Sequence, residues 1–126
     1  MTEPIQLTLP WPPSVNSMYR AIPRGKHCQN ILSRKGREYK ESALIAIACH
    51  NLPPGELDGD LQVTLDLYPP DARRRDVDNY SKVVLDVLTE GCVWHDDSQI
   101  ADLHILKRPR DKDNPRVVVT ISAITP

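Results

Sequence analysis

The sequence predicts a single α/β domain of the α+β type over residues 1–126, with two helices on one face of a mixed β-sheet and the order β-α-β-α-β-β. A chain of 126 residues can bury one hydrophobic core without disulfides. Hydrophobic residues make up 40% and charged residues 26%, a composition typical of soluble globular proteins that excludes a largely disordered chain. Segments in which apolar and polar residues alternate, as they do in strands, are interleaved with two segments whose apolar residues have helical spacing.

No segment of the sequence predicts a membrane span or a secretory signal. The longest unbroken apolar run, residues 43–49, is far shorter than the roughly 18 residues that a membrane helix needs. The N-terminus lacks a basic region followed by an apolar stretch. We therefore expect a cytoplasmic protein with no membrane partner.

The N-terminal half predicts one strand and one helix. Residues 5–9 alternate apolar and polar side chains, which predicts a strand that the following prolines end. Residues 10–33 are rich in Pro, Asn, Gly and basic side chains, and we expect them to be mostly irregular. Ser33 is the expected N-cap of a helix that runs to about residue 50. One face of this helix carries Tyr39, Ala43 and Ile47.

The C-terminal half predicts three strands and a second helix. Residues 61–67 alternate cleanly and predict a strand, and residues 77–90 have the spacing of a helix with Gly91 as its C-cap. Residues 100–107 and 116–124 predict two more strands, separated by a polar turn. The expected core positions of the helix are Val84, Leu85 and Leu88.

The three cysteines, Cys28, Cys49 and Cys92, are widely spaced and form no Cys-x-x-Cys pair. An odd, scattered set indicates reduced thiols rather than a disulfide framework. Histidines lie near all three, but the spacing favours buried free thiols over a soft-metal site.

The charges are distributed unevenly although the net charge is only −1. Residues 1–50 carry seven Lys or Arg and three Asp or Glu, and residues 106–126 carry five and two. Residues 51–105 carry four and twelve. An acidic middle between basic flanks is consistent with a surface that attracts a polyanion beside a carboxylate cluster, or with unrelated solvated faces.

The most informative stretch surrounds the start of the second predicted helix. Asp76 and Asp78 are two residues apart in this segment, so their carboxylates can point the same way. Lys82 lies four residues after Asp78, on the same helix face. A second acidic pair, Asp96 and Asp97, follows the helix and precedes the next predicted strand.

Three or four carboxylates that converge on one spot require a cation between them. Oxygen ligands without thiol or imidazole partners favour Mg²⁺ or Mn²⁺. Such an ion binds phosphate and lowers the pKa of bound water, which suits phosphodiester chemistry. Lys82 would supply a fixed positive charge, and the run Arg73, Arg74 and Arg75 would contact the backbone of a phosphodiester substrate.

The same residues are also consistent with structural roles. Asp78 can cap the helix, and its pairing with Lys82 is a common surface interaction. Asp96 and Asp97 can form an exposed turn. Trp11 is interpreted as core rather than as a platform for stacking bases. Tyr80 is expected to pack, and Asp86 is the expected salt-bridge partner of Lys82.

Four segments together resemble the RusA family of Holliday junction resolvases. They are Leu-Pro-Trp-Pro-Pro-Ser-Val-Asn-Ser-Met-Tyr-Arg at 9–20, Arg-Arg-Asp-Val-Asp-Asn-Tyr-Ser-Lys at 74–82, Leu-Asp-Val-Leu at 85–88 and Trp-His-Asp-Asp-Ser-Gln at 94–99. The resemblance covers nearly the whole chain in the same order. It implies one RusA-like endonuclease domain that acts as a homodimer, requires Mg²⁺ with Mn²⁺ as a substitute, and nicks four-way junction DNA symmetrically. Family members are typically encoded by phages and prophages.

The resemblance also implies roles for individual residues. Asp76, Asp78 and Asp97 are similar to the metal-binding carboxylates of the family, and Lys82 to its catalytic lysine. Asp96 is the adjacent acid and the weaker candidate ligand. Asn79 matches the motif, which is consistent with contact to DNA or with hydrogen bonding at the helix start. His95 stands where the family often has an apolar residue.

The expected function is therefore a metal-dependent endodeoxyribonuclease of recombination and repair. A four-way junction has near two-fold symmetry and needs two cuts, so two subunits with one site each would supply both. Two alternatives stay open: a non-catalytic junction-binding protein, and a general metal-dependent nuclease that cuts linear DNA equally well. The absence of a glycine-rich phosphate loop argues against a nucleoside-triphosphate enzyme.

Overall fold

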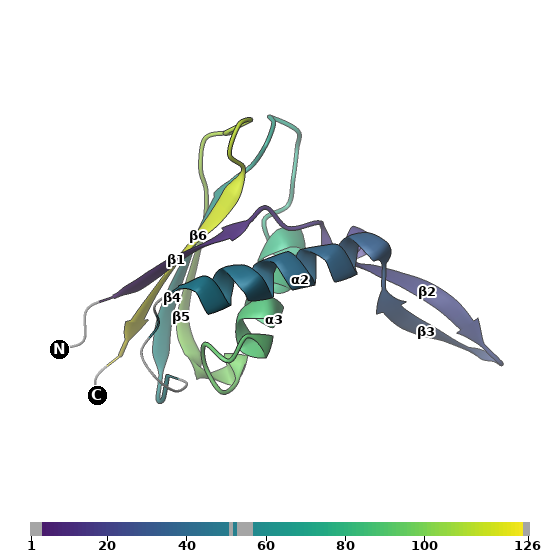
Figure 1. The fold of residues 1–126 in the computed structure, drawn as a ribbon, viewed down its shortest axis with the longest axis horizontal. Coiled ribbons are helices and arrows are strands. Elements are labelled where there is room, and N and C mark those ends of the chain that lie inside the picture. Colours follow the sequence, from purple (N-terminus) through teal and green to yellow (C-terminus); the bar gives the residue numbers. More distant parts are fainter. Residues whose placement is uncertain (1–3, 51, 53–56, 125–126) are drawn as a thin grey trace.

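A computed structural model describes residues 4–50, 52 and 57–124 (Figure 1). Its strands and helices follow the predicted order, with additional elements near the N-terminus. In chain order they are β1 (Ile5–Pro10), α1 (Val15–Met18), β2 (Tyr19–Arg24), β3 (His27–Leu32), α2 (Arg34–Cys49), β4 (Leu61–Tyr68), α3 (Asp78–Glu90), the 3₁₀ turn η1 (Asp97–Gln99), β5 (Ile100–Lys107) and β6 (Arg116–Ala123).

The larger sheet is mixed, as predicted, and its strands lie in the order β1-β6-β4-β5. Strand β6 is antiparallel to both β1 and β4, whereas β4 and β5 are parallel. A connection between parallel neighbours must return along the sheet, and α3 makes this return from the C-terminal end of β4 to the N-terminal end of β5. The two ends of α3 therefore lie near opposite ends of these strands (Figure 1).

Helices α2 and α3 cover one face of this sheet, which confirms that part of the prediction (Figure 1). Every second residue of β4 faces them, and each of these side chains is at most 2% exposed. The indole of Trp94 is fully buried, and its N–H donates a hydrogen bond to the Thr89 hydroxyl at 2.7 Å. The predicted core residues are buried except for the half-buried Leu85: Tyr39, Ala43 and Ile47 of α2, and Val84 and Leu88 of α3.

The expectation that residues 10–33 are mostly irregular is wrong. They contain α1 and a β2–β3 hairpin, which forms a separate two-stranded sheet. Arg24 pairs with His27, so the turn has two residues, and Gly25 takes its first position with φ +62°. A positive φ at this position is what a tight hairpin needs and what glycine adopts without strain. The hairpin buries few of its side chains, so its strands lack the alternation that marks a strand in sequence.

The two long helices begin and end close to their predicted limits. Ser33 caps α2 as predicted, because its hydroxyl accepts a hydrogen bond from the Gly36 N–H at 3.0 Å. Helix α3 begins one residue later than predicted, after Val77, and ends at the predicted C-cap Gly91. Within the described ranges, no helix is long and apolar enough to cross a membrane.

The prediction that the three thiols are buried is wrong, although all three are free. Cys28 lies on the hairpin, Cys49 is the last residue of α2, and Cys92 lies in the turn after α3. Each is exposed because its segment ends at or leaves the core rather than packing against it.

Candidate functional site

The segment between β4 and α3, residues 69–77, has a defined position at the C-terminal end of β4. Two backbone hydrogen bonds join this end of the strand to the β5–β6 connection: Arg108 N–H donates to the Leu67 carbonyl at 2.8 Å, and Asp111 N–H donates to the Pro69 carbonyl at 2.7 Å. The other end of the segment continues into the buried helix α3. The segment 69–77 is therefore anchored at both ends.

Arg75 is the most constrained side chain of this segment. Its guanidinium forms an ion pair with Asp71 at 2.7 Å and donates to the Asp71 carbonyl at 3.2 Å. It also lies over the rings of Trp11 and Tyr80, 5.7 and 6.0 Å from their centroids, and these rings contact each other at 5.2 Å. Only 11% of the Arg75 side chain is exposed. The hydrogen bond from Arg75 holds the pKa of the Asp71 carboxyl below its usual value, so this pair stays charged.

The three arginines predicted to contact DNA thus differ in their surroundings. Arg73 is exposed and lies 3.6 Å from Asp71, a weak contact for a solvated pair. Arg74 is exposed and forms no ion pair with any described residue. Arg75 is fixed against aromatic rings. The structure therefore offers one constrained and two solvent-exposed cations near Asp76.

Asp76 and Asp78 are exposed, and neither carboxylate accepts a hydrogen bond or pairs with a cation among the described residues. The N-cap of α3 is Val77 with no side-chain cap bond, so the structure does not support a capping role for Asp78. Asp76 lines an open pocket of about 390 Å³ together with Arg74, Arg75, Asn79 and Tyr80. Carboxylates without partners, beside a fixed guanidinium, can bind a hard cation and a phosphate together.

Lys82 extends into solvent one turn along α3, with 67% of its side chain exposed. Its ammonium lies 3.8 Å from Asp86, the partner predicted for it, and the structure does not pair it with Asp78. A contact of this length at the surface contributes little to stability. The ammonium is therefore available to a ligand at the start of α3.

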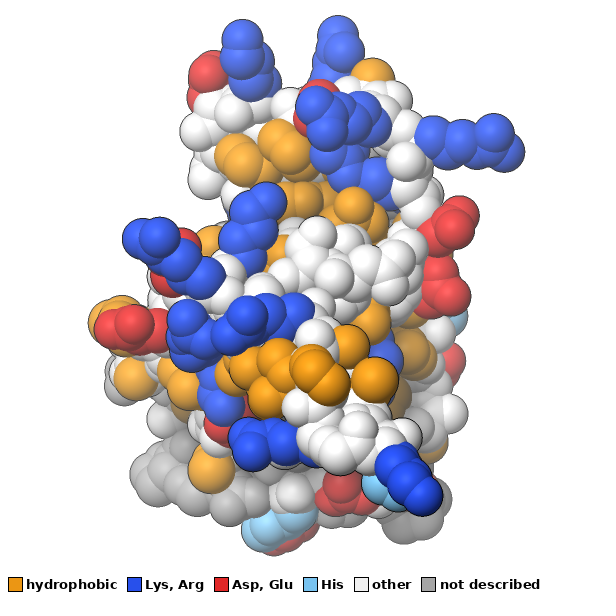
Figure 2. All heavy atoms as spheres, turned by 90° about the vertical axis from the view of Figure 1, so that its right-hand side faces the viewer, with side chains coloured by type: hydrophobic (Ala, Val, Ile, Leu, Met, Phe, Trp, Pro, Cys, Tyr) orange, Lys and Arg blue, Asp and Glu red, His pale blue; other side chains and the backbone are white. Residues whose placement is uncertain are grey.

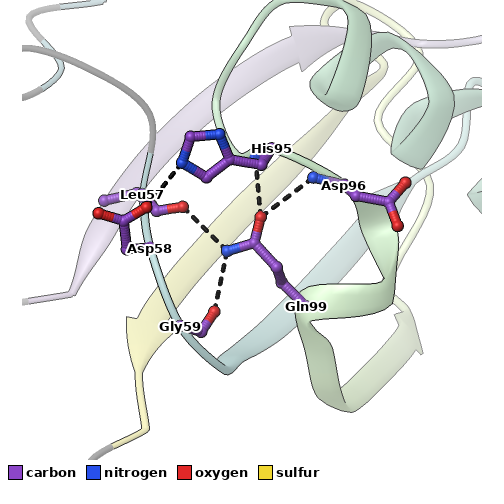
Figure 3. Close-up of polar contacts among 6 residues, drawn as sticks. All are labelled: Leu57, Asp58, Gly59, His95, Asp96 and Gln99. Carbon is purple, nitrogen blue, oxygen red and sulfur yellow. Dashed lines mark hydrogen bonds and ion pairs between the residues drawn. The ribbon is translucent and has the colours of Figure 1, made fainter.

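The second acidic pair lies in the turn after α3, where Gln99 forms several hydrogen bonds around Asp96 (Figure 3). The Gln99 side-chain oxygen accepts from the backbone N–H groups of His95 and Asp96 at 2.7 and 3.0 Å. Its amide nitrogen donates to the Leu57 and Gly59 carbonyls, both at 2.9 Å. His95 contacts Asp58 at 2.6 Å. Gln99 therefore ties this turn to the segment that leads into β4.

Asp96 and Asp97 differ within this turn. Asp96 caps η1 by accepting from the Ser98 N–H at 3.3 Å, and its hydrogen bonds with Ser98 lower the pKa of its carboxyl. Asp97 is the first residue of η1 and is exposed. Asp96 thus has a structural role as the cap of η1, whereas Asp97 is exposed and does not cap this turn.

The structure does not bring all the predicted ligands together within one chain. Asp76 and Asp78 precede or begin α3, whereas Asp97 lies beyond its far end, beside the N-terminal end of β5. The 13 residues of α3 span about 20 Å at 1.5 Å per residue. Across the described part of the chain, no three Asp, Glu, His or Cys side chains gather closely enough to hold a metal.

Sequence reasoning missed Asp71 as a partner of Arg75 and missed the contact of Trp11 with Tyr80. Trp11 is half-buried and packs against the hydrophobic core, as expected, and its ring also contacts Tyr80 at the start of α3. The four-residue spacing between Asp71 and Arg75 was a local signal. The contact of Trp11 with α3 joins residues far apart in sequence, so local spacing cannot predict it.

Comparison with known proteins identifies related nucleases. Residues 10–122 match the model of a family described as endodeoxyribonuclease RusA. Proteins named crossover junction endodeoxyribonuclease RusA from Shigella sonnei and Escherichia coli K12 are each 35% identical to this chain over 116 residues, covering 92% of both chains. A protein of the same name from Enterobacteria phage 82 is equally similar. The matched range contains both the Asp76–Asp78 pair and η1.

Proposed function

Because this chain belongs to the RusA family of endodeoxyribonucleases, we propose that it is an Mg²⁺-dependent, structure-selective nuclease that resolves four-way DNA junctions by paired symmetric nicks. The substrate is supported by the relatives, which are named crossover junction endodeoxyribonucleases. The proposed setting is recombination and repair in the cytoplasm of a bacterial or phage-infected cell, because the relatives come from bacteria and a phage.

The observation that carries the chemistry is the pair of unpartnered carboxylates, Asp76 and Asp78, beside the fixed Arg75. A phosphate that approached one of these carboxylates to 4 Å would be repelled by about 4 kcal/mol at an effective dielectric constant of about 20. The Arg75 charge is already largely compensated by Asp71. A further cation between the phosphate and the carboxylates would remove this repulsion and hold the phosphate at the carboxylates.

The residues present fit Mg²⁺, with Mn²⁺ as a substitute. Mg²⁺ is commonly held by one or two protein carboxylates together with water and substrate phosphates, and Asp76 and Asp78 offer exposed oxygen ligands of this kind. Bound there, the ion neutralises phosphate charge and lowers the pKa of water. Arg74 and Asn79 line the same pocket and can donate hydrogen bonds to the DNA backbone. Lys82 can place its ammonium against charge that develops on the scissile phosphate.

A homodimer would supply the two cuts and would also explain the position of Asp97. Strand β5 is an edge of the larger sheet, so its outer N–H and C=O groups are open to pairing. Antiparallel pairing of two β5 strands about a two-fold axis places the N-terminal end of one against the C-terminal end of the other. Asp97 of one copy would then approach Asp76 and Asp78 of the second copy.

The side chains of β5 support this arrangement. Leu103 and Leu106 are 40% and 39% exposed, and both lie on this edge strand. They face opposite sides of the sheet, and a second copy of β5 paired along this edge would reduce the exposure of both. The proposed site is therefore composite, with Asp76, Asp78 and Lys82 from one copy and Asp97 from the other.

The proposal is tested with a labelled four-way junction and a linear duplex of the same sequence, each incubated in Mg²⁺, Mn²⁺ or EDTA. We expect the junction to be cut in either metal and bound without cleavage in EDTA, and the duplex to stay intact. Tight junction binding with no cut in any metal would instead indicate a non-catalytic binding protein. Equal cutting of both substrates would indicate a general nuclease.

A further inference from the structure

The β2–β3 hairpin extends from the body beyond the N-terminal end of α2 (Figure 1). Its six cross-strand pairs run without irregularity from Tyr19–Leu32 at the base to Arg24–His27 at the tip. The base is fixed, because Ser33 N–H donates to the Met18 carbonyl at 2.9 Å and the Ser33 hydroxyl also bonds to this region. The hairpin is therefore a projection with a defined direction.

The charges of this hairpin are confined to one face and the tip. Side chains alternate along a strand, and directly paired residues share a face. The face that contains Tyr19 carries no charged residue. Lys26 occupies the turn. The opposite, cationic face consists of Arg20, Ile22, Arg24, His27, Gln29 and Ile31.

No carboxylate of the described residues pairs with these cations. The sequence has no Asp or Glu from residue 4 to residue 37. Arg20, Arg24 and Lys26 are exposed, and within the described structure none of them forms an ion pair or a side-chain hydrogen bond. Figure 2 views the molecule from the side on which the hairpin projects, and Lys and Arg side chains are spread over much of this face.

The hairpin leaves the body close to the candidate site. Trp11, which precedes α1, packs on Tyr80 of α3 at 5.2 Å, and α1 contacts α3 before leading into β2. A duplex arm that extends from a phosphate near Asp76 toward α1 would therefore meet the hairpin.

We propose that the cationic face of the β2–β3 hairpin binds the phosphates of a duplex arm of the substrate, beyond the phosphate that is cut. This inference rests on the proposed function for its ligand, DNA. Arg24 lies four residues after Arg20 along the strand, a distance of about 13 Å. This is close to the roughly 12 Å width of a B-DNA major groove, which admits a two-stranded β-ribbon. The two arginines can therefore contact phosphates on both sides of one groove.

The test compares the double variant Arg20→Gln/Arg24→Gln with wild type and with Arg34→Gln. Arg34 is an exposed cation that pairs with Glu38 on α2 and serves as the matched control. Junction affinity is measured in EDTA over a range of salt concentrations, cleavage is measured at saturating protein in Mg²⁺, and the oligomeric state is measured by light scattering. Circular dichroism and thermal unfolding verify that each variant is folded.

We expect the double variant to bind the junction about tenfold more weakly near physiological salt, and its log–log salt slope to fall by about two, one for each lost phosphate contact. Cleavage at saturation and oligomeric state should match wild type, and Arg34→Gln should bind like wild type. Unchanged affinity and slope would overturn the inference, as would a changed oligomeric state without a specific loss of DNA affinity. A wild-type protein that binds junctions without cutting them overturns the proposed function but leaves this binding test decisive for the hairpin.

Discussion

Replacing Asp76 with Asn is expected to lower junction cleavage by about a thousandfold or more while leaving junction binding intact. The substitution keeps the size of the side chain and removes one of the two unpartnered carboxylates at the start of α3. A thousandfold loss corresponds to about 4 kcal/mol of transition-state stabilisation, which is within the range that a bound metal supplies. Binding in EDTA should be equal or tighter, because one negative charge near the phosphate is gone.

The matched control for this prediction is Asp113→Asn. Asp113 is an exposed carboxylate in the β5–β6 connection and lies outside the candidate site. Single-turnover cleavage in Mg²⁺ and binding in EDTA are measured for both variants. We expect Asp113→Asn to match wild type. A rate for Asp76→Asn within tenfold of wild type would remove this carboxylate from the metal site.

Mixing two inactive variants is expected to restore cleavage if the site is composite. Asp76→Asn and Asp97→Asn each disable both sites of their own homodimer. After subunit exchange about half of the dimers are mixed. One site of each mixed dimer then combines an intact Asp76–Asp78 pair with an intact Asp97, while the other site carries both defects. We therefore expect single nicks in the mixture, where each variant alone gives none.

The outcome of this mixing experiment distinguishes two arrangements. If the three carboxylates act within one chain, both sites of a mixed dimer carry one defect, and no activity returns. A Leu103→Lys variant tests the proposed contact directly, because it places a charge on the exposed edge strand β5. It should shift the protein toward monomer in light scattering and should lose cleavage. Restored activity in a mixture that stays monomeric would contradict the dimer.

Most of the larger sheet could be predicted because its strands have one buried face. In β4 every second side chain is buried, so apolar and polar residues alternate in the sequence itself. The hairpin was missed for the opposite physical reason. Residues such as Gln29 and Asn30 lie on a projection that contacts the body chiefly at its base, so burial imposes little pattern on them. The remaining indication of a hairpin in the sequence was Gly25, which has a positive φ in its turn.

The candidate site could be predicted only as far as local spacing extends. The Asp76–Asp78 pair and the nearby arginines occupy one short segment, and the structure keeps them together at the start of α3. The position of Asp97 depends on the direction and length of α3 and on the parallel pairing of β4 with β5. The direction of α3 and the pairing of β4 with β5 are set by packing of the sheet, and they cannot be predicted from residue spacing in the sequence.

The central claim is that this chain cuts four-way junctions in pairs of symmetric positions with an Asp76-dependent site. The most direct measurement labels each of the four strands of one junction in turn and maps every cut made in Mg²⁺ by wild type and by Asp76→Asn. We predict cuts at symmetry-related positions in two opposing strands, with both cuts absent in the variant and in a linear duplex. Cuts scattered over all four strands, or cuts that persist in Asp76→Asn, would contradict it.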